Sequence, residues 1–314
     1  MSELTLVTDF FDIGRGEDSD PTLRRTSSKY LEEFKRWARI QNRLIVYTDA
    51  NTAPEIMEIR RAFGREEQTT IIVIDDLFGL EPELFAKMER FSKEESYLKF
   101  RYLPKASSSN PKYDYLWMMK YYFMNDAYNR GLLDGVDNVA WFDFAFDHGG
   151  AVYYDEEDFN FLWDYDWKGK IHIFCLKDPA TTSCITTLQY LPDCVQGCMY
   201  GVAKEMIPTF WKIVREAIEA LLMIEVLDDD QEMVLMAYKK YPQYFEPHVV
   251  GWQMGLKECG GEHMKVREPE PGPEENRLKR AIRLAVRKVI PNKKDPARIY
   301  AQTCYEEAKR IFGR

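Results

Sequence analysis

The stretch VAWFDFAFDHGG, residues 139–150, joins a buried strand to a group of polar residues at its end. The apolar run 139–142 leads directly to Asp143, and Asp147 and His148 follow before a pair of glycines. Open α/β sheets bind ligands outside the carboxyl ends of their parallel strands, so an acid here is well placed to hold a metal-bound phosphate. The alternative is an Asp that ends a strand and starts a turn, as Asp often does.

Strand and helix patterns alternate on the N-terminal side of this stretch. LTLVTDFF (4–11), RLIVYTD (43–49) and TTIIVID (69–75) are short apolar runs typical of buried strands. Helical patterns separate them, one expected to begin at Asp20-Pro21 and another at Pro54, and a third helix begins at EPELFAKMERF. This β-α-β-α-β order predicts a parallel, doubly wound sheet.

The pattern continues beyond this region. We expect helices over about 113–132 and 203–225 and a strand over 170–176. The apolar run CVQGCMYGV (194–202) contains Gly197 and Gly201, which indicates that its backbone comes close to a neighbour or a ligand. The fold class predicted for residues 1–266 is α/β, with a mixed sheet flanked by helices.

Composition narrows the class of protein. Hydrophobic residues make up 45% of the 314 residues, as in a globular protein, and no apolar run is long enough for a membrane span. The N-terminus is acidic and lacks the basic region of a secretory signal, and six cysteines in a chain of this size do not form a disulfide framework. We therefore expect a reduced cytoplasmic protein.

Charge divides the chain into two parts. Residues 277–314 carry twelve Lys/Arg and three Asp/Glu, a net charge of +9. Because the whole chain has a net charge of −9, residues 1–276 carry −18. This acidic body argues against nucleic acid as the main ligand. A linker rich in Pro and acids, 267–275, precedes a basic amphipathic helix at 277–290. This basic helical tail, 267–314 with its linker, is expected either to lie on an anionic membrane surface or to pack on the acidic body.

Two groups of residues follow the first two predicted strands. The first group consists of Asp9, Asp12, Gly14, Arg15 and Gly16. Its backbone N–H groups and guanidinium suit a phosphate, although a turn with a surface Arg explains them equally well. Tyr47 and Asp49 end the second strand, where the ring can stack on a base and the carboxylate can accept from a ribose hydroxyl. The alternative for Asp49 is the start of a helix.

Two further groups surround the opening stretch. Lys120, on the preceding helix, is a candidate phosphate contact beside Asp143. The run Asp228–Glu232 contains Asp229, Asp230 and Gln231, which we take as candidate catalytic residues because crowded acids raise one another's pKa or hold a cation. A helix start that uses acids for stability alone is the alternative.

Several segments together resemble one known family. They are VTDFFDIGRG (7–16), LRRTSSKYLEEFKRWARIQNRLIVYTD (23–49), NVAWFDFAF (138–146), VQGCMYGVAKEMIPTFW (195–211) and DDQEMVLMAYKKYPQYFE (229–246). Over about residues 3–252 the chain is similar to the HtrL/YibB-like family of bacterial proteins, which is associated with lipopolysaccharide and capsule loci. That family is regarded as glycosyltransferase-like, with a GT-A type nucleotide-sugar fold.

The resemblance implies roles for particular positions. It implies Asp143 at the metal-diphosphate site, with Asp147 as a further candidate ligand and His248 as a late third ligand of the kind that some metal-dependent glycosyltransferases use. It also implies that Asp12 and Arg15 lie near the donor. Asp49 is expected near the nucleoside, and Asp230 and Gln231 near the acceptor. The chain departs from the expected pattern at Ala145, so there is no D-x-D pair, and at Cys198, where the family prefers Gly.

The resulting hypothesis is a cytoplasmic, GT-A-like glycosyltransferase, with residues 277–290 against the inner face of the cytoplasmic membrane. It moves a sugar from a nucleotide-sugar donor, with UDP-sugars favoured, to a cell-envelope, capsular or lipid-linked glycan, assisted by Mn²⁺ or Mg²⁺. Two alternatives stay open: a sugar-phosphate or nucleotidyl transferase, and a non-catalytic subunit of a glycan-assembly complex.

Overall fold

The computed structural model describes residues 4–17, 24–94, 100, 110–190 and 193–267 of the 314-residue chain. The chain divides into two units, residues 1–266 and 267–314. Only Arg267 of the second unit is described, so the predicted linker and basic helix lie outside the described residues. All helices and strands that the structure describes belong to the first unit.

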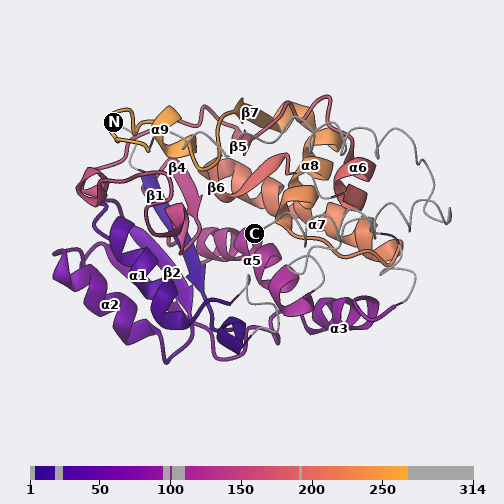
Figure 1. Ribbon diagram of the computed structural model, residues 1–314, viewed down its shortest axis with the longest axis horizontal. Helices are drawn as coiled ribbons and strands as arrows, with labels where there is room; N and C mark the ends of the chain where they lie inside the picture. The colour runs from indigo at the N-terminus through magenta and orange to yellow at the C-terminus, as the bar shows by residue number, and fades with distance from the viewer. Residues whose placement is uncertain (1–3, 18–23, 95–99, 101–109, 191–192, 268–314) are drawn as a thin grey trace, which may run out of the picture. The chain divides into compact units, whose positions relative to one another are not determined.

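A seven-stranded sheet forms the centre of this unit, in the order β3-β2-β1-β4-β6-β5-β7 (Figure 1). All neighbouring pairs are parallel except those of β6, which runs antiparallel to both β4 and β5. The strands are β1 (Leu4–Phe10), β2 (Leu44–Thr48), β3 (Thr69–Val73), β4 (Asn138–Phe142), β5 (Ile171–Cys175), β6 (Val195–Ala203) and β7 (Phe245–Val249). The predicted α/β fold, a doubly wound mixed sheet flanked by helices, is confirmed.

Helices cover both faces of the sheet because successive strand residues point to opposite sides. Val7, Ile45 and Val139 belong to the core on the side of α5 and α7, whereas Leu6 and Val46 belong to the core on the side of α1 and α2. The helices are α1 (Ser27–Trp37), α2 (Ala53–Ala62), α3 (Pro82–Phe91), α5 (Pro111–Asn129), α6 (Cys184–Tyr190), α7 (Ile207–Met223), α8 (Asp230–Lys240) and α9 (Gly255–Glu258). In the described part of the chain, no helix has the length and apolar character needed to cross a membrane.

The first helix begins later than predicted. It starts at Ser27, because the Thr26 hydroxyl accepts a hydrogen bond from the Lys29 amide at 3.3 Å and so caps the helix. Residues 24–26 are not helical, so no continuous helix runs from the Asp20-Pro21 pair. The loop between β1 and α1 is therefore longer, and it carries Arg25 to the carboxyl edge of the sheet.

Both glycines of β6 lie against large neighbours, as their positions in an apolar run indicate. A Cβ at Gly201 would meet the Trp167 indole at 2.5 Å, and one at Gly197 would meet the Asp230 carboxylate at 2.6 Å. The strand can therefore hold its central place between β4 and β5 only because these two residues have no side chain.

Candidate functional site

A cavity of about 380 Å³ lies where the winding direction of the sheet changes. From β1 the chain winds outward to β2 and β3, whereas β4 pairs with the other side of β1. Asp9 near the end of β1 and Asp143 just after β4 both line this cavity, together with Arg15, Arg25 and Trp117. Open α/β sheets bind their ligands at such a switch point.

Lys120 joins the cavity to the buried interior. Its ammonium group lies 2.8 Å from Asp143 Oδ1 and 3.1 Å from Asp230 Oδ2, and it donates a hydrogen bond to the Gly197 carbonyl at 2.7 Å. Its Nζ also lies 3.5 Å from the centre of the Trp117 ring. Burial lowers the pKa of Lys120, but the two carboxylates outweigh burial, so the net shift is upward and the lysine stays charged.

Asp230 lies beneath this lysine and does not line the cavity. The Tyr200 hydroxyl donates to its Oδ2 at 2.9 Å, and the Tyr121 hydroxyl lies 3.4 Å from the same atom. Burial raises the pKa of Asp230 to about 6, although Lys120 opposes the shift. The predicted catalytic residue thus contacts Lys120, which lines the cavity, but does not line the cavity itself.

Asp9, the first residue of the group predicted after the first strand, lines the cavity, although no separate role was predicted for it. Burial raises the pKa of its carboxyl well above the usual value, Lys120 opposes this, and Asp143 and Asp230 add to it. Its Oδ2 is buried, and no described residue bonds to it. Its place at a strand end, beside the predicted phosphate loop, is the sequence signal that placed it in that group.

The loop after β1 places two predicted residues, Asp12 and Arg15, at the cavity, and Gly14 lies between them in the chain. The Gly14 amide donates to Asp12 Oδ1 at 2.9 Å, and Gly14 itself has a φ of +84°, a backbone conformation that favours glycine. Arg15 donates to the Tyr30 hydroxyl at 2.7 Å, and its guanidinium carbon lies 4.6 Å from the centre of the Tyr113 ring. The turn therefore holds Arg15 between two aromatic rings on the cavity wall.

His148 also lines the cavity, although only its place in the opening stretch indicated it. Its φ of 44° lies in the left-handed region, which costs a non-glycine residue free energy and often marks a functional position. Arg25 Nη1 lies 3.1 Å from His148 Nδ1. Because arginine only donates, Nδ1 is the acceptor and the ring proton sits on Nε2. Partial removal of the ring from water, with Arg25 acting in the same direction, lowers the pKa of His148 to about 4, so the ring is neutral at pH 7.

Two predicted metal ligands lie away from Asp143. Asp147 is buried and accepts hydrogen bonds from the Val152 and Tyr153 amides at 2.6 and 2.9 Å, which fixes the turn after β4. His248 lies on β7, three strands from β4, where its Nε2 is 2.8 Å from His172 Nδ1. Neither residue lines the cavity, so the structure does not bring the three predicted ligands together.

The two residues predicted to contact the nucleoside lie elsewhere than in this cavity. Tyr47 is fully buried, stacks on Phe123 with ring centres 4.4 Å apart, and donates to Asp126 at 2.9 Å. Asp49 accepts from the Asn51 amide at 2.8 Å at the start of α2. It lines a neighbouring hollow of about 480 Å³ whose wall Asp12 shares with the first cavity.

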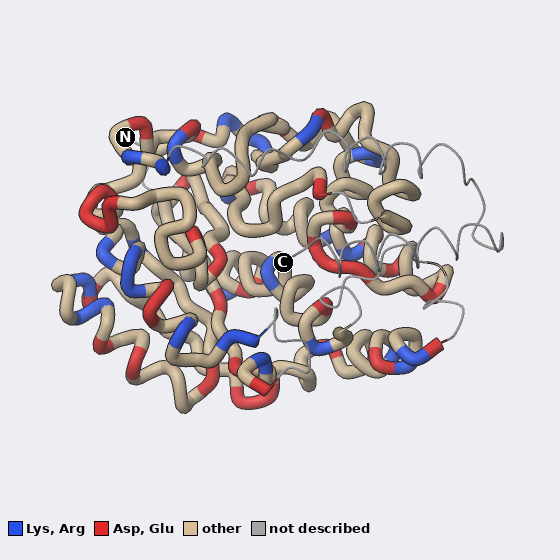
Figure 2. Tube along the Cα trace, in the orientation of Figure 1, with Lys and Arg blue, Asp and Glu red and all other residues tan. Residues whose placement is uncertain are grey.

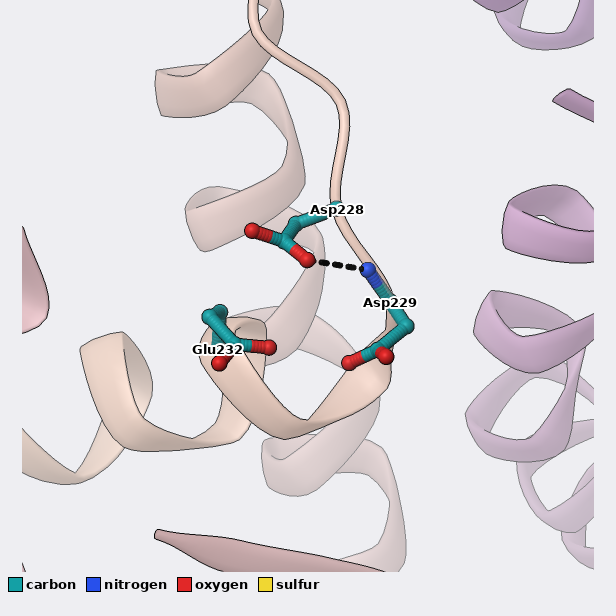
Figure 3. A group of neighbouring side chains, drawn as sticks. All are labelled: Asp228, Asp229 and Glu232. Carbon is teal, nitrogen blue, oxygen red and sulfur yellow. Dashed lines mark hydrogen bonds between the residues drawn. The ribbon is translucent and has the colours of Figure 1, made fainter. Parts of the chain in front are cut away.

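The start of α8 carries a buried acidic cluster, Asp228, Asp229 and Glu232 (Figure 3). One ligand oxygen from each residue lies within 4.8 Å of the others, so the cluster could hold a metal ion. Asp228 Oδ1 accepts from the Asp229 amide at 2.8 Å, and Asp229 Oδ1 accepts from the Gln231 amide at 3.1 Å. Asp229 and Gln231 also line the cavity, so of the two predicted acceptor-side residues Gln231 lies at its wall and Asp230 does not.

Acidic and basic residues are interspersed over the described elements (Figure 2). The cavity repeats this mixture on a small scale, since Arg15 and Arg25 line the same space as Asp9, Asp143 and Asp229. Such a site suits a ligand that carries both negative phosphates and neutral hydroxyl groups.

Comparisons with known proteins agree with the sequence resemblance. Protein HtrL of Escherichia coli (strain K12) is 29% identical over 266 residues, which cover 80% of this chain and 89% of that protein. The apo crystal structure of mouse xyloside xylosyltransferase 1 is similar with a TM-score of 0.41 and 11% identity, over 78% of this chain and 85% of that one. A family model described as "Bacterial protein of unknown function (HtrL_YibB)" matches residues 2–254. The chain belongs to the HtrL/YibB family.

Proposed function

We propose that this protein is a glycosyltransferase that moves a sugar from a nucleotide-sugar donor to a glycan acceptor. The observation that carries the proposal is the cavity at the switch point of the sheet, which combines two guanidinium groups with strand-end and helix-end carboxylates. A nucleotide sugar offers the matching groups, a diphosphate for the guanidiniums and sugar hydroxyls for the carboxylates.

The donor diphosphate is held by Arg15 and Arg25. Both lie in the segment between β1 and α1 and line the cavity. Arginine suits this task because its planar fork donates two parallel hydrogen bonds to phosphate oxygens. The aromatic side chains of Tyr30, Tyr113 and Trp117 line the same space and offer flat apolar surfaces to the sugar or the base. A UDP-sugar is our first choice of donor.

The divalent cation, Mn²⁺ or Mg²⁺, is assigned to the cluster of Asp228, Asp229 and Glu232. These carboxylates are hard oxygen ligands of the kind that both ions prefer, and all three are buried. When bound, the ion supplies positive charge next to the cavity, which Asp229 also lines.

The transfer step uses Asp229, one of the carboxylates that line the cavity. The acceptor hydroxyl oxygen forms a bond to the anomeric carbon, the bond from that carbon to the diphosphate oxygen breaks, and the hydroxyl proton passes to Asp229. Asp229 is preferred to Asp230 because only Asp229 lines the cavity. His148, neutral and with its proton on Nε2, offers a hydrogen-bond donor to the bound substrate.

Binding tests the proposal most simply. UDP-, GDP-, CMP- and dTDP-sugars are added to the full chain with and without Mn²⁺, and a donor that binds the native state raises the melting temperature. Release of nucleoside diphosphate supports the glycosyltransferase, whereas release of monophosphate or pyrophosphate identifies the sugar-phosphate or nucleotidyl transferase. If no nucleotide binds, the non-catalytic subunit is the better account.

The acceptor is proposed to be a cell-envelope, capsular or lipid-linked glycan, reached from the cytoplasm. The segment 277–290 carries six Lys/Arg and no acid, a charge that suits an anionic membrane surface at about 1 kcal/mol for each basic residue. Truncation after Val266 should abolish sedimentation with anionic liposomes while the remaining chain keeps its circular dichroism spectrum. If the truncated chain is insoluble or unfolded instead, the tail belongs to the core.

A further inference from the structure

The Lys120 ammonium group has a complete set of acceptors. It has three N–H donors, and three oxygens surround it: the Gly197 carbonyl at 2.7 Å, Asp143 Oδ1 at 2.8 Å and Asp230 Oδ2 at 3.1 Å. The face of the Trp117 ring, 3.5 Å away, covers it further. The side chain is only 5% exposed, so the lysine is fixed between the two carboxylates and does not reach out to a phosphate.

Asp143 has one carboxylate oxygen, Oδ2, left to offer to a metal ion. Its Oδ1 accepts from Trp141 Nε1 at 2.8 Å in addition to contacting Lys120. The second acid of a D-x-D pair is replaced by Ala145. Among the described residues, the one group of three converging ligands lies at Asp228–Glu232 and excludes Asp143. Mn²⁺ and Mg²⁺ need several oxygen ligands, and here an ion would also be repelled by a neighbouring ammonium.

We infer that the Lys120 ammonium group takes the place of a metal ion at Asp143. The negative charge at this strand end is then neutralised by the protein's own side chain, and any divalent ion is bound without Asp143. This assignment of charge is independent of the reaction. Its consequence for catalysis rests on the proposed function: the leaving diphosphate is met by Arg15 and Arg25, and not by a metal ion on the acid after β4.

Direct titration of Mn²⁺, followed by electron paramagnetic resonance without any nucleotide, tests the inference. Asp143→Asn should leave the Mn²⁺ affinity of the full chain within about twofold of the parent, whereas Glu232→Gln should weaken any site at α8 by about tenfold or more. A parent chain that binds no Mn²⁺ also agrees with the inference. A loss of about tenfold or more in Asp143→Asn would overturn it.

A second pair of variants tests the role of Lys120 itself. Lys120→Met removes the ammonium and should create an additional Mn²⁺ site that disappears again in Lys120→Met combined with Asp143→Asn. Lys112→Met, on the exposed side of the same helix, is the matched control and should create no site. If Lys120→Met does not fold, the comparison of the parent with Asp143→Asn still decides the matter. Because no donor is present, the outcome does not depend on whether the protein is a transferase.

Discussion

Asp49 and Asp143 occupy equivalent places, each directly after a parallel strand, yet their surroundings differ. Asp49 Oδ1 accepts from the Asn51 and Thr52 amides at 2.8 and 2.9 Å, both within three residues along the chain. Asp143 contacts Lys120, which comes from α5, and lines the cavity between β1 and β4. A strand-end acid with local partners starts a helix, whereas one whose partner comes from a distant element belongs to a site. The winding of the sheet decides between them.

The largest effect should follow from exchanging these two acids for amides. Asp143→Asn should lower turnover by about a hundredfold or more, because it leaves the Lys120 charge unbalanced at the cavity while the shape of the side chain is kept. Asp49→Asn should keep near-normal turnover and lose at most about 1 kcal/mol of unfolding free energy, as expected for a helix-start residue. Equal losses of turnover in the two variants would show that Asp49 and Asp143 do not differ in role. Urea unfolding and initial rates measure both quantities.

A smaller effect is expected at the loop after β1. Arg15→Ala should weaken donor binding by about tenfold to a hundredfold, because a charged hydrogen bond to phosphate is worth about 1.5–3 kcal/mol. Its melting temperature should change little, since Arg15 lies on the cavity wall and not in either core. Arg61→Ala, at an exposed position of α2, is the control. Unchanged donor affinity in Arg15→Ala by calorimetry would place the diphosphate elsewhere.

The smallest effect is a pH dependence at Asp9. Because burial raises its pKa above the usual 3.8, the fold favours the neutral carboxyl, and the stability that this provides is lost as the pH rises through the raised pKa. The melting temperature of the parent should therefore fall relative to that of Asp9→Asn as the pH rises above the usual pKa of 3.8 and through the raised one. Glu83→Gln, exposed on α3, should show no such trend. If the difference in melting temperature between the parent and Asp9→Asn stays constant, or if the parent becomes the more stable chain as the pH rises, Asp9 is ionised throughout.

Most strands and helices could be predicted from the sequence because the patterns that indicate them are local. Five apolar runs matched β1 to β5, and Pro54, the predicted helix start, lies in the first turn of α2. The start of α1 was wrong because Asp20-Pro21 resembles a cap as strongly as Thr26 does. Strand β7 was not predicted, since PHV contains a proline and lacks an apolar run; it pairs only with β5 at one end of the sheet.

The site was harder to predict because its contacts are distant in sequence. The pairing of Lys120 with Asp230 spans 110 residues, and nothing near either residue indicates it. Three predicted residues were identified because they lie at strand or helix ends: Asp143, Asp229 and Gln231. The fold does bring these ends to one cavity. Tyr47 shows the limit of that reasoning, because alternation along β2 turns its ring into the core and away from the edge.

The measurement that tests the central claim most directly is a fluorine NMR titration with a UDP-sugar. The chain has seven tryptophans, which can be replaced by fluorotryptophan and assigned by single Trp→Phe changes. Trp117 and Trp252 line the cavity, whereas Trp211 lies in a separate hollow formed by α7. If the cavity at the switch point binds the donor, the Trp117 and Trp252 resonances will move in a saturable way and that of Trp211 will not. A saturable change confined to Trp211, or no change at any tryptophan with any nucleotide sugar, would contradict the account.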